Sequence, residues 1–193
     1  MKFKILSYKS VESTNTIAIN LIRKNNYKQG FVHALEQRKG RGQYGKKWIS
    51  MKGNFFGSIF FQLKKNYPST EEFNIINPML NIEILSNYCG KKKTFFKSPN
   101  DIYINKKKIC GILQEVITKE SKKYLIVGIG INLLSNPNIK NYPSTNIFKE
   151  TNQKLKVSKM LSLIVTKYEN FFSNLNLYNF KNFKMKSKKS LMN

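Results

Sequence analysis

The sequence has few of the residues from which many catalytic and metal sites are built. It contains one histidine, His33, one aspartate, Asp101, and two cysteines, Cys89 and Cys110, which do not form a CxxC pair. A Ser/His/Asp triad and a zinc site made of histidines and cysteines are therefore not expected. Two cysteines in 193 residues fit a reducing compartment, so we expect a cytoplasmic protein.

Long apolar runs are also missing. Residues 1–7 lack the apolar core of a signal peptide, and no stretch stays apolar over the roughly 20 residues that a membrane helix needs, so no membrane partner is expected. With 193 residues and 40% hydrophobic content, the chain is long enough for one globular domain. We expect that domain to span residues 1–175 and to be followed by a basic, poorly ordered tail over 176–193.

Acidic residues are scarce, and the formal net charge is +25. Only three of the 35 basic residues are arginines, and the lysines are spread along the chain among many asparagines and isoleucines. Such a distribution indicates a compositional bias rather than a docking face. We expect non-specific attraction to nucleic acid at low salt and no specific nucleic-acid partner, with a basic nucleic-acid-binding module as an alternative function.

One segment, residues 36–48, concentrates the rare residues. It holds Arg38 and Arg41, the only tryptophan, Trp48, and three closely spaced glycines, Gly40, Gly42 and Gly45. Glycines let a backbone turn sharply and present several N–H groups to one anion, and a guanidinium can bind a phosphate or carboxylate with two hydrogen bonds. The segment therefore predicts a loop that binds the phosphate of a flat ligand. A plain hairpin turn with solvated lysines is the alternative.

The same glycines match the dinucleotide-binding pattern GxGxxG, but their context does not fit it. That pattern opens a helix and is followed, about 20 residues later, by an acidic residue. Here a strand-like segment follows, and residues 60–65 contain no carboxylate. We therefore reject a dinucleotide site.

The remaining pattern predicts alternating strands and helices. Ser13, Thr14 and Asn15 precede a helical segment, where they suit capping and could also bind a small polar ligand group. A second helix is expected to begin at Asn77-Pro78 and to end before Gly90. Other expected elements are strands at 2–8, 31–37, 54–63 and 124–134, a hairpin of 101–105 and 108–117, a loop over 135–150 and a helix from 158.

The expected hairpin carries Asp101 and Lys108 near its two ends, where they could face one pocket. Locally, Lys106 to Lys108 also fit a solvated basic turn. Gly111 lies inside a strand, which indicates a close approach of backbone or ligand. Asn132 ends an apolar strand and could cap it or present its amide to a ligand.

Five motifs, taken in order over residues 13 to 133, resemble those of the biotin protein ligases. They are STN, QxxGRGxxGxxW, KxPND, KxxGIL and GxGIN. The resemblance implies an α+β fold like the catalytic core of class II aminoacyl-tRNA synthetases, with a mixed, largely antiparallel sheet flanked by helices. A lipoate or octanoyl transferase with the same core is the alternative enzyme.

The resemblance also implies a reaction in two steps. Biotin and Mg-ATP give biotinyl-adenylate and pyrophosphate, and the biotinyl group then passes to a lysine of a biotin carboxyl carrier domain of acetyl-CoA carboxylase or a related biotin enzyme. Mg²⁺ would arrive with ATP, so no resident metal site is expected. A homodimer is compatible with the sequence.

Site residues follow from the matching motif positions. Lys108 and Arg41 would be the catalytic cations. The implied biotin contacts are Ser13, Thr14, Asn15, Gln37, Gly40, Arg41, Gly42, Gln43, Lys108 and Gly111. The implied ATP contacts are Arg41, Gln43, Lys46, Trp48, Lys97, Asn100, Asp101 and Asn132.

The sequence departs from the family pattern at several positions. The family usually has GRGRRGR in the glycine loop (residues 40–46), and here Gln43, Tyr44 and Lys46 replace three arginines. Ser98 stands where the family usually has tryptophan. We also expect no N-terminal DNA-binding domain, and a C-terminal β domain that is absent or eroded.

Overall fold

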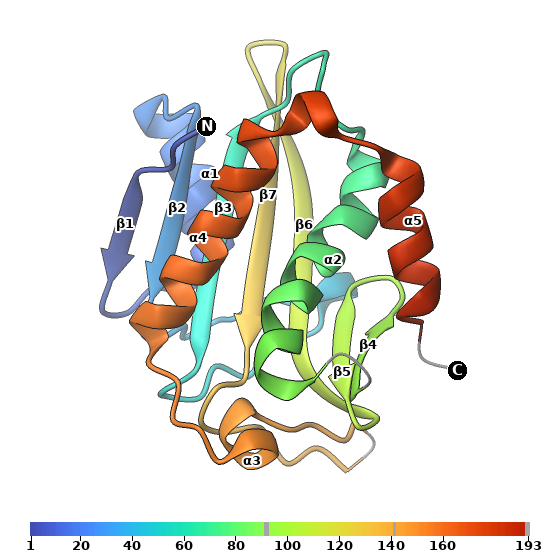
Figure 1. Ribbon diagram of the computed structural model, residues 1–193. Coiled ribbons are helices and arrows are strands. Elements are labelled where there is room, and N and C mark those ends of the chain that lie inside the picture. Colours follow the sequence, from blue (N-terminus) through green and yellow to red (C-terminus); the bar gives the residue numbers. More distant parts are fainter. Residues whose placement is uncertain (91–92, 141, 192–193) are drawn as a thin grey trace.

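A seven-stranded mixed sheet forms the centre of the computed structural model, which describes residues 1–90, 93–140 and 142–191 (Figure 1). The strand order is β1-β2-β3-β7-β6-β5-β4. β1 pairs with β2 in parallel, and the other neighbouring strands pair antiparallel. The strands are β1 (Ile5–Tyr8), β2 (Gln29–Ala34), β3 (Phe55–Gln62), β4 (Thr94–Lys97), β5 (Asp101–Ile104), β6 (Lys107–Lys119) and β7 (Lys122–Ile131). The expected α+β fold is confirmed.

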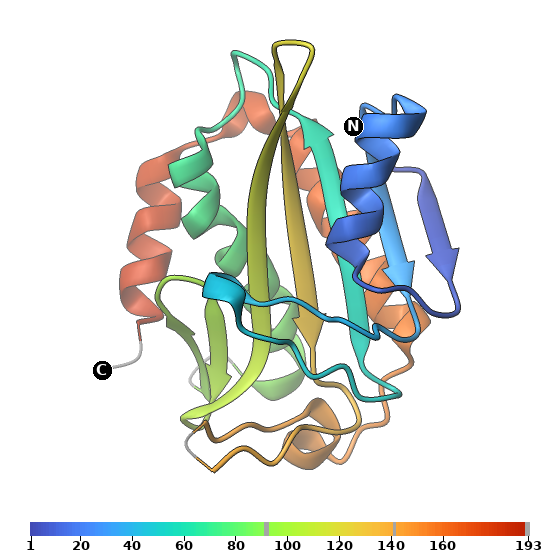
Figure 2. The ribbon, with the colours of Figure 1, turned by 180° about the vertical axis from the view of Figure 1, so that it is seen from behind.

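Helices cover both faces of this sheet. They are α1 (Thr14–Asn25), α2 (Thr70–Cys89), α3 (Ile147–Thr151), α4 (Val157–Ser173) and α5 (Phe180–Lys189). In Figure 1, α2, α4 and α5 lie over one face, and Figure 2 shows α1 on the opposite face. The segment after β2 also crosses that opposite face, and it contains a short 3₁₀ turn at Gln43–Gly45.

Two hydrophobic cores result from this arrangement. The larger core lies between the sheet and α2 and α4, and its rings meet edge to face, as in Phe61 and Phe172, whose centroids are 4.7 Å apart. The smaller core packs Ala18 and Ile22 of α1 against β3 residue Phe60. Because alternate side chains of a strand point to opposite faces, β3 supplies both cores, which explains its continuous apolar sequence.

Helix α2 begins earlier than the sequence pattern predicts. Its N-cap is Ser69, whose hydroxyl accepts from the Glu72 N–H, while the Glu72 carboxylate accepts from the Ser69 N–H. This capping box satisfies two backbone donors, so the helix starts there and Pro78 lies inside it. The prediction of a start at Asn77-Pro78 was wrong, and the end before Gly90 was right.

The C-terminal segment is more ordered than expected. Residues 180–189 form α5, which lies beside α2. The Phe183 ring packs against the rings of Phe171 and Tyr178 at 6.0 and 5.9 Å, and Lys186 pairs with Glu83 of α2 at 2.7 Å. Packing against α2 thus stabilises a helix that its own sequence favours only weakly. The expected disorder over 176–193 was wrong for α5; residues 192 and 193 lie outside the described residues.

Two smaller differences concern short elements. Strand β4 was not expected, and it extends the sheet beyond the predicted hairpin. The expected loop over 135–150 contains the short helix α3, while residue 141 lies outside the described residues. Among the helices of the described ranges, none is both long and apolar enough to cross a membrane.

Candidate active site

A cavity of about 540 Å³ opens on the face of the sheet that α1 covers, a size typical of small-ligand sites. Its walls come from the start of α1, the glycine loop, the β5–β6 hairpin, the end of β7 and the segment that follows β7. Arg41 and Lys108 both line it. So does every other residue that the sequence singled out for the site, except Gly40.

Gly40 lies beneath the loop that it begins. Its carbonyl accepts a hydrogen bond from the Trp48 N–H at 2.9 Å. A Cβ at this position would lie 2.5 Å from the Trp48 carbonyl oxygen and 2.7 Å from the Ser50 hydroxyl. Gly40 therefore permits the tight base of the loop and is not among the residues that line the cavity, while its predicted contact with biotin stays a prediction.

The side chain of Gln37, in the segment that follows β2, forms hydrogen bonds with the start of α1. Its Oε1 accepts from the Thr14 N–H at 2.8 Å and from the Thr14 hydroxyl at 3.1 Å, and its Nε2 donates to Ser50. Ser13, the N-cap residue, makes no capping hydrogen bond with its side chain. The helix is thus capped by a distant amide, and the side chain of Ser13 is left to face the cavity.

Both the oxygen and the nitrogen of the Asn15 side-chain amide are hydrogen-bonded to protein groups. Its Oδ1 accepts from the hydroxyl of Ser58, and its Nδ2 donates to Glu115 Oε2 at 2.7 Å and to the Leu113 carbonyl at 3.3 Å. Gly128 makes room for this amide, because a Cβ there would lie 2.3 Å from Asn15 Oδ1. The side chain is therefore held in one orientation at the cavity wall.

Trp48 packs flat against the two central strands. A Cβ at Gly111 or at Gly130 would come within 2.6 or 2.5 Å of its ring atoms. The Lys108 amine lies 5.4 Å from the ring centroid. The close approach that the sequence indicated at Gly111 is thus made by the indole, and Gly130 serves the same purpose on β7.

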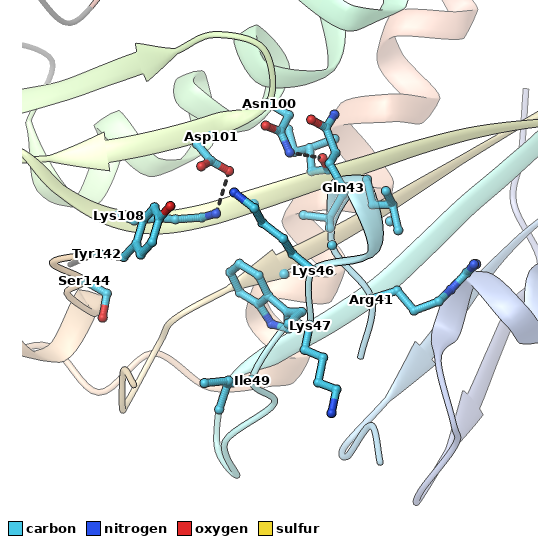
Figure 3. Close-up of a pocket in the computed structure, with 18 of the residues that line it drawn as sticks. Arg41, Gln43, Lys46, Lys47, Ile49, Asn100, Asp101, Lys108, Tyr142 and Ser144 are labelled. Carbon is cyan, nitrogen blue, oxygen red and sulfur yellow. Dashed lines mark hydrogen bonds and ion pairs between the residues drawn. The ribbon is translucent and has the colours of Figure 1, made fainter. Parts of the chain in front are cut away.

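Asp101 and Lys108 face one another across the β5–β6 hairpin, with 2.7 Å between carboxylate and amine. In Figure 3, the Lys46 side chain extends toward this pair, whereas Arg41 points the other way. The Lys46 amine also lies 5.5 Å from the ring centroid of Tyr142. The two amines of Lys46 and Lys108 therefore place positive charge in the same part of the cavity.

Arg41 is occupied by a protein carboxylate. Its Nη2 donates to Glu115 Oε2 at 2.6 Å. Arg41 lines the same cavity as Lys108, as expected, but its guanidinium is paired with Glu115, and Figure 3 shows the side chain of Lys46 rather than that of Arg41 extending toward Lys108. The catalytic role of Arg41 stays a prediction.

Three further predicted residues, Asn132, Asn100 and Lys97, also line the cavity. Asn132 is only 2% exposed; its Nδ2 donates to the Thr145 carbonyl at 3.0 Å, and its Oδ1 finds no hydrogen-bond partner in the described part of the chain. Buried amide oxygens are normally satisfied, so this one suits a donor on a ligand. Asn100 donates to the Ile112 carbonyl at 2.8 Å, and Lys97 lies over the Tyr103 ring.

The buried thiol next to this site, that of Cys110, is not activated as a nucleophile. Cys110 is fully buried, which raises the pKa of its thiol, and the neighbouring Asp101 charge raises it further. The thiol is therefore protonated and unreactive at neutral pH. His33 lies buried on β2 and does not line the cavity. The residues that the structure describes hold no group of three or more His, Cys, Asp or Glu side chains suited to a metal ion.

The segment that carries the five motifs also matches a known protein family. The model of the biotin/lipoate A/B protein ligase family matches residues 7–132. The chain belongs to this family. The matched range contains every residue predicted for the site, from Ser13 to Asn132.

Curated members of the family show moderate similarity. A biotin–[acetyl-CoA-carboxylase] ligase of Paracoccus denitrificans is 26% identical over 157 residues, which are 78% of this chain and 65% of that protein. The bifunctional ligase/repressor BirA of Escherichia coli K12 is 31% identical over 126 residues, which are 64% of this chain and 38% of that protein. The chain thus spans less than two thirds of the length of these relatives.

Solved structures of the family share the fold over nearly the whole chain. The biotin protein ligase of Aquifex aeolicus in complex with biotin and ATP has a TM-score of 0.80 and 26% identity, covering 98% of this chain and 78% of that one. The biotin protein ligase of Leishmania major in complex with biotinyl-5-AMP has a TM-score of 0.84 at 23% identity, covering 98% and 81%. At 23% identity, the similarity to the Leishmania major structure supports the fold alone.

Sequence reasoning missed three residues of the site region. Ser58 is fully buried and donates to Asn15, and its signal was a lone hydroxyl within the aromatic run 55–61. Glu115 binds both Asn15 and Arg41, and Tyr142 lines the cavity under Lys46. No local pattern pointed to these last two, because their partners are distant in the sequence.

Proposed function

We propose that this member of the family ligates biotin to a lysine of a biotin carboxyl carrier domain, by way of biotinyl-adenylate and at the expense of ATP. The observation that carries the proposal is the single cavity that joins a rigid polar network at the start of α1 to the amines of Lys46 and Lys108. The ligases named above and their complexes with biotin, ATP and biotinyl-5-AMP support the same assignment.

The polar network suits the head group of biotin. A ureido group has two N–H donors and one carbonyl acceptor, so it needs both kinds of partner at fixed positions. Ser13, Asn15 and Gln37 supply hydroxyl and amide groups, and the neighbouring contacts hold two of these side chains in place. Fixed polar partners of this kind discriminate strongly against a ligand that lacks the matching groups.

In the first step, an oxygen of the biotin carboxylate attacks the α-phosphorus of Mg-ATP, and pyrophosphate leaves. Two anions must approach one another, so the cavity has to supply positive charge. Lys108, oriented by Asp101, and Lys46 are placed to do so. The chain contributes by positioning and by electrostatic stabilisation, and no protein nucleophile is needed.

In the second step, the uncharged amine of the carrier lysine attacks the acyl carbon of biotinyl-adenylate. An amide bond forms, AMP leaves, and the amine loses a proton. Biotinyl-adenylate is a mixed anhydride that water hydrolyses, so the glycine loop and Trp48 serve to keep water away from it. Trp48, Lys97, Asn100 and Asn132 are the proposed nucleotide contacts.

The proposal also covers the metal ion, the protein partner and the location of the enzyme. Mg²⁺ enters with ATP as part of the substrate. The partner is the carrier domain of acetyl-CoA carboxylase or of a related biotin enzyme, and the two buried free thiols, Cys89 and Cys110, suit a cytoplasmic location. Because α5 packs on α2, we place the end of the catalytic unit after α5 rather than at residue 175.

The test is a reaction with biotin, Mg-ATP and a biotin carboxyl carrier domain, followed by mass spectrometry of the carrier and measurement of AMP. One biotinylated lysine is expected. A parallel reaction with lipoate tests the other branch of the family, and it should give little product because lipoate lacks a ureido group. Folded protein that forms no adenylate with biotin would contradict the proposal, and preferential use of lipoate would replace it.

A further inference from the structure

Glu115 has so far appeared only as a hydrogen-bond partner of Asn15 and Arg41. It lies on β6, and a single oxygen, Oε2, accepts hydrogen bonds from two side chains: Arg41 Nη2 at 2.6 Å and Asn15 Nδ2 at 2.7 Å. The Glu115 side chain is 25% exposed and that of Arg41 41%. One carboxylate thus joins the single arginine of the glycine loop (residues 40–46) to the asparagine at the start of α1.

The glycine loop is a small hairpin, and Arg41 is at its base. Arg41 and Lys47 form an antiparallel bridge, and the Gly42 N–H donates to the Lys46 carbonyl at 2.7 Å. Whatever fixes Arg41 therefore also fixes the backbone that carries Lys46. In Figure 3, Lys46 extends from this hairpin toward Asp101 and Lys108, and Arg41 extends away from them.

Between the hairpin and strand β6 lies a hollow. This hollow of about 450 Å³ is lined by residues 41–46 and by the strand segment 113–115, and Arg41 and Glu115 are both among its lining residues. Tyr44, at the tip of the hairpin, is 91% exposed and contributes little buried surface. Among the hydrogen bonds and ion pairs of the described residues, the Arg41–Glu115 contact is the one that joins a side chain of residues 41–46 to the sheet.

We propose that Glu115 is a positioning residue for adenylate formation. Through Arg41 it anchors the hairpin so that Lys46 reaches the Asp101–Lys108 pair. Through Asn15 it holds the polar side chains proposed to bind the biotin head at a fixed position relative to the hairpin. Arg41 acts in this scheme as part of the anchor, and Lys46 and Lys108 act as the cations of the site. The inference rests on the proposed function for its kinetic consequence, but the anchoring itself concerns the ligand-free protein.

The kinetic test is a double-mutant cycle on Glu115→Gln and Arg41→Gln. The glutamine at 115 keeps an oxygen for Asn15, so the KM for biotin should change little. We expect kcat for pyrophosphate release to fall on the order of 10- to 100-fold in each single variant, because small displacements of positioned groups cost that much. If Glu115 acts through Arg41, the double variant falls no further than the worse single variant. Losses that multiply would overturn the proposal, since each residue would then act independently.

The structural test needs no substrate. In limited trypsinolysis of ligand-free protein, cleavage after Lys46 and Lys47, identified by mass spectrometry, should be several-fold faster in both single variants, with unchanged melting temperatures. Glu12→Gln is the matched control: it removes an exposed ion pair to Lys39, 2.8 Å long, beside the same loop, and it should leave the cleavage rate unchanged.

Wild-type cleavage rates in Glu115→Gln would overturn the anchoring. If wild-type protein forms no adenylate, the proposed function fails, and the cleavage rates still decide whether Glu115 anchors the loop.

Discussion

The two faces of the sheet are built for different purposes. On the face covered by α2, α4 and α5, large aromatic and aliphatic side chains such as Phe61, Phe73 and Phe172 pack into one extensive core. On the face covered by α1, the apolar core is small, and the central strands carry glycines at 111, 128 and 130, on which Trp48 and Asn15 lie. One face thus supplies most of the stability, and the other leaves backbone surface available for a ligand. Substitutions on the two faces should separate stability from activity.

The largest expected effect on stability comes from the packed face. Phe61→Ala removes a fully buried ring that contacts Phe172, Phe73 and Tyr67, so it should lower the free energy of unfolding by about 3–5 kcal/mol. Urea denaturation measures this loss. Leu35→Ala, at a side chain that is 53% exposed, is the control and should cost less than about 0.5 kcal/mol. Equal losses in the two variants would show that the core is not where the structure places it.

The largest expected effect on activity comes from the cavity. Lys108→Ala removes the amine that Asp101 orients, and it should reduce adenylate formation by about 10²–10³-fold, with little change in melting temperature, because the side chain is partly exposed. Pyrophosphate release and thermal unfolding are the two measurements. Lys107→Ala, at the neighbouring exposed residue, serves as control. Full activity in Lys108→Ala would remove this residue from the mechanism.

A pair of glycine substitutions compares the two faces directly. A Cβ at Gly130 would lie 2.5 Å from the Trp48 ring, whereas a Cβ at Gly57 would lie 2.6 Å from the Phe31 ring. Gly130→Ala should displace Trp48, the proposed nucleotide contact, and so shift the fluorescence of the chain's single tryptophan. It should also raise the KM for ATP about tenfold, which corresponds to a loss of about 1.4 kcal/mol of binding free energy. Gly57→Ala should lower stability and leave the tryptophan emission of the folded protein unchanged. The reverse pattern would mean that the two faces have been assigned wrongly.

The smallest expected effect concerns pH. His33 is 5% exposed and stacks on Phe55, and its burial lowers its pKa below the ordinary value of 6.5. The unfolded chain then binds a proton more readily than the folded protein, so stability is retained above pH 6.5 and declines as the pH falls below it. Urea denaturation from pH 7.5 down to about 5, above the range where most carboxylates titrate, isolates this contribution. His33→Phe should flatten that decline, and an unchanged slope would exclude His33 as its source.

Sequence reasoning recovered the parts of the site that are contiguous in the chain. The glycine loop, the Asp101–Lys108 hairpin and Asn132 each lie in a short motif, and all of them border one cavity. The reasoning failed where a partner is distant in sequence: the pairing of Glu115 with Arg41 spans 74 residues and leaves no local pattern. The sequence therefore predicted Arg41 as a catalytic cation but gave no sign of its ion pair with Glu115.

The fold was predictable to a similar extent and for a similar reason. Strands β3, β6 and β7 were predicted because their apolar patterns are strong, and α4 because its apolar residues recur with helical spacing. The start of α2 was misplaced because Pro78 was given more weight than the Ser69–Glu72 capping box. Helix α5 was missed because its order comes from contacts with α2 rather than from its own lysine-rich sequence.

The chain segment after α5 covers the outer edge of the sheet. Leu191 forms a parallel bridge with Phe96 of β4, and the Phe96 N–H donates to the Ser190 carbonyl at 2.6 Å. Uncovered strand edges recruit strands from other molecules and promote aggregation. Shortened versions for crystallisation or labelling should therefore retain residues through 191, since a cut at 175 would bare both this edge and the side of α2 that α5 shields.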